Sequence, residues 1–147
     1  MFKKLLATEN TWTTLPVRLA LAALFIAHGG QKMFGWFGGP GLAATIQSFQ
    51  QYMGIPAFLA VLVAVTEFFG GLAILVGLLT RVTAVGLSSL MLVAMFMVHW
   101  QHGFFLNWEG KPNVGHGIEM NVVILGLTLA LLIAGGGALS LDRKLSQ

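Results

Sequence analysis

A hydrophobic stretch of 25 residues with one charge at its centre constrains this chain more than any other feature. It runs from Ile55 to Leu79, and its single charged residue is Glu67. As a helix it measures roughly 37 Å, which is enough to cross a bilayer with some tilt. Glu67 then lies near the middle of the hydrocarbon, where a carboxylate that faces lipid costs about 2.5–3.5 kcal/mol. We therefore predict that Glu67 faces the interior of a helix bundle, protonated or paired.

The neighbours of Glu67 on its helical face support this prediction. Ala60, Ala64 and Gly71 follow helical spacing with Glu67, and all three are small. Small residues let the backbones of neighbouring helices approach closely within a membrane.

The composition indicates an integral membrane protein. Hydrophobic residues make up 56% of the chain and charged residues only 9%, against about 25% charged residues in soluble domains. The absence of cysteine excludes disulfides, thiol redox relays and thiolate metal sites. The net charge of +3 is small and gives no reason to expect nucleic acid as a partner.

We predict an all-α integral membrane fold, in which a single domain over residues 1–147 forms an antiparallel bundle of four transmembrane helices. A short amphipathic helix is expected at the membrane interface between the first and second spans, because it is too short and too polar to cross. The spans are expected at about 14–34, 55–79, 82–105 and 118–134, and the amphipathic helix at about 42–53.

The basic residues predict the orientation. Six of them fall on one side of the predicted membrane and two on the other, which places both termini in the cytoplasm by the positive-inside rule. Residues 1–13 are expected to lie at the membrane interface and to lead into the first transmembrane helix. That helix is expected to stay in the mature protein and not to be a cleaved signal peptide, since Arg18 interrupts the approach to the apolar run and no clean cleavage site follows. The six are Lys3, Lys4, Arg18, Arg81, Arg143 and Lys144, and the two are Lys32 and Lys111.

This topology gathers most of the unusual polar residues in the outer half of the bundle. They fall late in the first and third spans and at the start of the fourth, with the central acid of the second span beneath them. The pattern predicts a ligand pocket that opens to the extracytoplasmic side. The predicted ligand-binding residues are His28, Gln31, Lys32, Glu67, His99 and Glu119.

A metal site is a second interpretation of the same region. His99 and His102 lie three residues apart, and His116 and Glu119 have the same spacing, so one metal ion could engage either pair. The bland alternative is that these side chains are solvated near a wet loop. Met91 and Met95 are interpreted as core packing and not as copper ligands.

Several motifs resemble one known family. They are Arg18 with HGGQKMFG at 28–35, the segment EFFGGL that begins at Glu67, the run GLLTR that ends at Arg81, the polar loop leading to Glu119, and GGGALSLD ending at Asp142. Over about residues 15–142 the chain resembles the DoxX family of small bacterial membrane proteins. The resemblance implies a bacterial inner-membrane location and a role close to redox chemistry, quinone stress or membrane oxidoreductase complexes. It supplies no proven catalytic residue.

The leading functional hypothesis is a redox-associated accessory protein that binds a quinone-like or other small lipophilic molecule. The chain contains no haem or iron–sulfur motif and no complete catalytic constellation, so any electron transfer requires a bound cofactor. The alternatives are a non-catalytic assembly subunit of a membrane oxidoreductase and a metal-handling protein. Expected partners are the lipid bilayer, membrane or periplasmic oxidoreductase subunits, and a second copy of the chain.

Overall fold

A computed structural model describes residues 5–147, and within them every regular element is a helix. The predicted all-helical fold is therefore confirmed. Residues 1–4, which include Lys3 and Lys4 of the expected interfacial lead, lie outside the described residues. The main helices are α2 (Thr14–Phe34), α3 (Gly41–Met53), α4 (Ala57–Val76), α5 (Thr80–Ala94), the π-helical turn η2 (Met95–His99), α6 (Glu119–Ala134) and α7 (Leu141–Ser146). Two short 3₁₀ turns are also present, η1 (Trp36–Gly38) and η3 (Trp100–His102).

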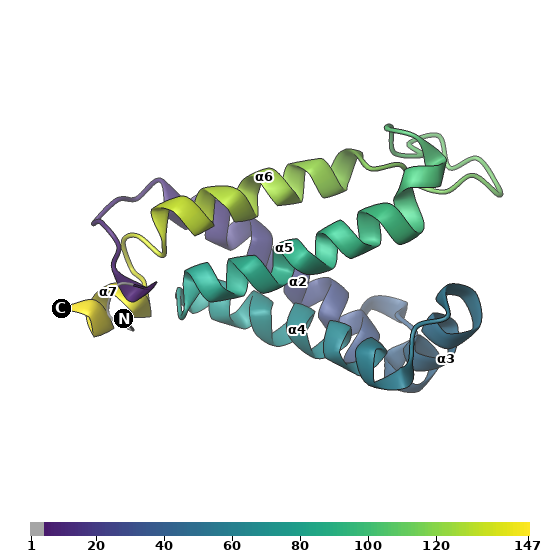
Figure 1. Ribbon diagram of the computed structural model, residues 1–147, viewed down its shortest axis with the longest axis horizontal. Helices are drawn as coiled ribbons and strands as arrows, with labels where there is room; N and C mark the ends of the chain where they lie inside the picture. Colours follow the sequence, from purple (N-terminus) through teal and green to yellow (C-terminus); the bar gives the residue numbers. More distant parts are fainter. Residues whose placement is uncertain (1–4) are drawn as a thin grey trace.

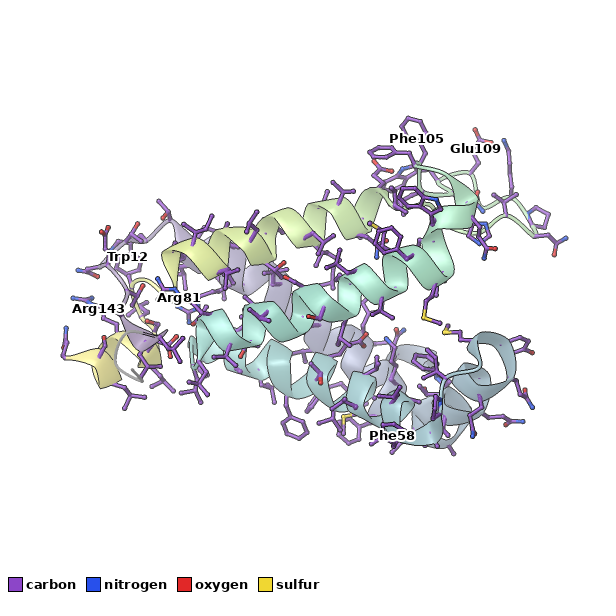
Figure 2. All side chains as sticks on the ribbon, viewed as in Figure 1. Trp12, Phe58, Arg81, Phe105, Glu109 and Arg143 are labelled. Atoms are coloured by element: carbon purple, nitrogen blue, oxygen red, sulfur yellow. The ribbon has the colours of Figure 1, made fainter. Side chains whose placement is uncertain are left out.

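The helices form two pairs that meet at one end of the molecule. α2 packs along α4, and α5 packs along α6. Both termini and α7 lie at the end where the pairs meet, while α3 and the loop 103–118 lie at the opposite end (Figure 1). Arg81 and Arg143 lie with Trp12 at the end of the termini, and Glu109 and Phe105 lie at the far end (Figure 2).

Two helical segments are long and apolar enough to cross a membrane, Ala57–Val76 and Thr80–His102. α6 is apolar but has 16 residues, which span roughly 24 Å against a hydrocarbon thickness of about 30 Å. α2 has the length, with 21 residues, but carries Arg18, His28 and Lys32. The four-span bundle and the interfacial position of α3 stay predictions.

Small residues bring α2 and α4 into close contact. Ala60, Ala64 and Gly71 are buried on the same face of α4 as Glu67, which confirms the predicted packed face. A Cβ atom on Gly71 would come within 2.8 Å of the backbone nitrogen of Ile26 in α2. The two backbones are thus too close for any side chain between them.

Replacing Gly29 with Ala should separate this helix pair. The added Cβ atom would overlap the backbone nitrogen and Cα of Phe68 in α4, and overpacking of this kind costs about 1–3 kcal/mol. Unfolding by SDS titration from mixed micelles measures the loss. Gly126→Ala is the matched control, because nothing lies within 4 Å of that position and an alanine there should stabilise α6 by up to about 1 kcal/mol. Equal effects of the two substitutions would contradict the close approach.

A buried arginine joins three segments at the end where the termini lie. Arg18 of α2 is 1% exposed. All five of its N–H groups have carbonyl acceptors at 2.6–3.3 Å, two at the end of α4 and three in the segment that precedes α7. The acceptors are the carbonyl oxygens of Ile74, Leu75, Gly136, Ala138 and Leu139.

Asp142 holds the turn between α4 and α5 against the same segment. Its carboxylate accepts hydrogen bonds from the backbone N–H groups of Leu79 at 2.6 Å and Thr80 at 2.7 Å. Its own backbone N–H donates to the carbonyl of Gly77 at 2.9 Å. Gly77 has a φ of +67°, and a Cβ atom there would overlap Ser140 and approach the Arg18 guanidinium, so this turn requires glycine. This end of the bundle is closed by polar contacts that are nearly all satisfied within the chain.

Candidate functional site

A cavity of about 490 Å³ lies between the two helix pairs, in the half of the molecule away from the termini. This volume is within the range of about 300–1,000 Å³ that is typical of small-molecule sites. Most of the lining is apolar and comes from all four long helices, α3 and the loop 103–118. The polar lining residues are His28, Lys32, Glu67, His99, Asn107, Trp108, His116 and Asn121.

The centre of the polar lining is an ion pair between α2 and α4. Lys32 Nζ donates to Glu67 Oε2 at 2.6 Å, and the Glu67 side chain is only 6% exposed. Glu67 is therefore paired, which was one of the two states expected for a carboxylate inside the bundle. The pairing satisfies a charge that lipid could not solvate.

The pair retains hydrogen-bonding capacity toward the cavity. Across residues 5–147, Lys32 Nζ has no acceptor besides Glu67, and Glu67 Oε1 has no donor. An ammonium has three N–H groups, so two of them are available to a ligand. Neither ring nitrogen of His28 bonds to another described residue. The site therefore offers donors and one anionic acceptor at the edge of an apolar space.

The structure brings together four of the six residues predicted to bind a ligand. His28, Lys32, Glu67 and His99 all line the cavity. Gln31 does not, and it packs instead against Gly39, beyond η1. Glu119 is also outside the lining.

Glu119 and two histidines fasten the loop 103–118 over the far end of the bundle. Glu119 Oε2 accepts from the N–H of Leu106 at 3.0 Å. His99 Nδ1 contacts the carbonyl oxygen of His116 at 2.8 Å, and His116 Nδ1 accepts from the N–H of Asn107 at 3.2 Å. We call these three contacts the loop latch. They give these residues a structural role that the sequence pattern did not indicate.

The metal-site interpretation gains no support from this geometry. Within residues 5–147, no three His, Asp or Glu side chains come close enough together to hold a metal ion. His99 and His116 are engaged in the loop latch, and His102 lies in a separate hollow that the loop lines.

Sequence reasoning missed the methionines of the cavity. Met53, Met91, Met97 and Met120 come from α3, α5, η2 and α6, and they are four of the seven methionines in the chain. Met91 was interpreted as packing, and nothing in the spacing along the chain shows that four such residues face one space. Trp108, in the loop 103–118, also lines the cavity.

Comparison with known proteins gives consistent matches. The DoxX family model matches residues 13–100. The inner membrane protein YqjF of Escherichia coli is 35% identical over 138 residues, covering 90% of this chain and 92% of the relative. The uncharacterized membrane protein Rv3486 of Mycobacterium tuberculosis is 36% identical over 150 residues, covering 98% and 88%. A Bacillus subtilis protein named "Putative oxidoreductase CatD" is 28% identical over 129 residues, covering 88% and 84%. No solved structure matches significantly.

Proposed function

Because the chain belongs to the DoxX family and encloses an apolar cavity with an ion pair in its wall, we propose that it binds a quinone-like lipophilic molecule in the bacterial inner membrane. The observation that carries the proposal is the Lys32–Glu67 pair, whose remaining donors and acceptor reach the cavity. A site of this kind favours a flat apolar ligand with polar oxygens at its edge.

The pair assigns a role to each polar group of the ligand. A carbonyl oxygen of the ligand accepts from Lys32 Nζ, and in the reduced quinol form a hydroxyl group donates to Glu67 Oε1. His28, on the same wall, is the second group able to give or accept a hydrogen bond. The donor to a quinone carbonyl is thus Lys32, and a protonated Glu67 is not required.

The role that follows is that of a redox-associated accessory protein. The name of the Bacillus subtilis relative, which contains the word oxidoreductase, supports this redox-associated role. The chain has no cysteine, so the redox chemistry belongs to the bound molecule. The protein then holds that molecule at a defined depth and orientation.

The proposal includes a single membrane domain of four spans with both termini in the cytoplasm. Arg18, Arg81 and Arg143 lie at the end of the termini, as the positive-inside rule requires of a cytoplasmic end. The cavity, in the other half, then faces the extracytoplasmic side. α2 and α6 cross the membrane as partners of the longer apolar helices against which they pack.

Binding of decylubiquinone to the purified protein in lipid nanodiscs tests the proposal. Glu67→Gln keeps the shape of the side chain but removes the charge that holds Lys32 Nζ in place as the donor to the quinone carbonyl. Hydrogen bonds to charged groups contribute about 1.5–3 kcal/mol, so we expect an affinity weaker by about tenfold or more. Equilibrium dialysis measures the dissociation constant.

Glu109→Gln is the matched control. Glu109 also pairs with a lysine, Lys111, at 2.7 Å, but both side chains are exposed and lie in the loop. The affinity of the Glu109→Gln variant for decylubiquinone should equal that of the wild type. Equal affinities for all three proteins would remove Glu67 from the site. Failure of the wild type to bind, with partner polypeptides retained on purification, would favour the assembly-subunit alternative.

A further inference from the structure

The cavity lining reaches the surface of the molecule on the flank, between α3 and the π-helical turn η2, and also at the loop 103–118, where Trp108 is 77% exposed. Val93 and Met97 line the cavity, yet they are 50% and 49% exposed. The facing wall consists of Phe49, Met53 and Ile55. Sulfur-containing side chains point from both walls into the space between them (Figure 2). We call this opening the flank opening; the residues on both of its walls are apolar.

In the proposed four-span arrangement, the flank opening lies in the outer edge of the hydrocarbon, beside the interfacial helix α3. Met97 is 17 residues from Thr80, where α5 begins, so it lies roughly 26 Å along the segment from the end of the termini. Thr80–His102 is long enough to cross a membrane, and the hydrocarbon is about 30 Å thick. At this depth a molecule can reach the opening directly from the lipid.

The two walls can move apart without breaking a hydrogen bond between them. Over the described residues, no hydrogen bond joins 41–56 to 80–102. The far end is different, because the loop latch ties the loop 103–118 to itself, to the start of α6 and to the last residue of η2, His99. Met95–His99 is moreover a π-helical turn, and such turns occur frequently at functional sites.

We propose that the ligand enters sideways from the bilayer through the flank opening, with Met53 and Met97 as its gate residues. The inference rests on the proposed function and deepens it: the ligand is a planar quinone-type ring with an apolar tail. Unbranched thioether side chains have three rotatable bonds and adapt their shape to a passing group. The ring passes between the two methionines to reach Lys32 and Glu67, and the tail stays in the lipid.

The chain has no cysteine, so a single introduced thiol can be labelled selectively. Met97→Cys, coupled to a bulky maleimide and placed in nanodiscs, should bind decylubiquinone at least tenfold more slowly than the unlabelled variant. Stopped-flow quenching of tryptophan fluorescence measures the rate, because Trp108 lines the cavity. Dissociation should slow by the same factor, which leaves the equilibrium affinity within about threefold.

Two labelled controls separate the routes. Leu129→Cys carries the label at a similarly exposed site, 53% exposed and away from the cavity, and its rate should not change. Val114→Cys carries it in the loop at the far end, and its rate should also stay unchanged. Slowing by the Val114 label, or normal entry past the Met97 label, would overturn the lateral route and leave the binding site intact. Absence of binding by the wild type would refute the binding function itself, and the lateral route with it.

Discussion

Replacing Arg18 with Met should lower the free energy of unfolding by about 4 kcal/mol or more, the largest loss expected from any single substitution in this chain. The arginine is fully buried and donates to five carbonyl oxygens. A methionine of similar length fills the space but leaves the carbonyls of Leu75, Ala138 and Leu139 without donors, while Gly136 still accepts from Thr14 and Ile74 from Gly77. Each unsatisfied buried group costs about 1–3 kcal/mol. Unfolding by SDS titration, followed by circular dichroism, measures the difference.

Two companion variants make this result specific. Arg18→Lys keeps the charge but presents three N–H groups from one nitrogen, which cannot reach acceptors spread around a planar guanidinium, so its loss should be intermediate. Arg143→Met removes a partly exposed arginine whose contact with Asn10 lies at the surface, and the loss of stability should stay below about 1 kcal/mol. If Arg18→Met is no worse than Arg143→Met, the five contacts do not hold this end together.

Replacing Lys32 with Met should be the second most destabilising change, because it leaves the Glu67 carboxylate buried without a partner. Breaking a buried ion pair from one side costs about 3–5 kcal/mol, and the Glu67 side chain is 6% exposed. The double variant Lys32→Met with Glu67→Gln removes both charges and should recover most of that loss. It should still fail to bind decylubiquinone.

A double-mutant cycle over these four proteins measures the coupling between the two side chains. We expect a coupling energy of about 2 kcal/mol or more. The same cycle on Glu109 and Lys111 is the control, since those side chains are 73% and 63% exposed and an exposed pair contributes about 0–1 kcal/mol. Couplings of equal size at the two sites would contradict a buried pair in the cavity wall.

The helical ranges could be predicted because clear sequence signals mark the ends of the helices. Hydrophobic runs are long and end at glycine, as at Gly35, Gly54, Gly77 and Gly135, each of which adopts a positive φ. The burial of Glu67 could also be predicted, since the cost of a charge in lipid depends only on its position in the run.

The partners of the charged residues could not be predicted. Lys32 meets Glu67 from 35 residues away, and that contact depends on the relative rotation of two helices, which a hydrophobic pattern does not fix. The same rotation turns Gln31 out of the cavity while it turns Lys32 in. From the sequence, Arg18 could be recognised only as a charged residue within a motif. Its hydrogen-bond acceptors are backbone carbonyls, which every residue has, so no sequence pattern identifies them.

The position of those acceptors has a consequence for biosynthesis. Arg18 donates to the carbonyls of Gly136 and Ala138, which are made 118 and 120 residues after it. At a translation rate of about 5–20 residues per second, roughly 6–24 s pass before these acceptors exist. During that interval the nascent first helix carries an uncompensated guanidinium. The contacts that join this end of the bundle therefore form late, after the segment before α7 has left the ribosome. Insertion of the first helix into the membrane precedes the formation of these tertiary contacts.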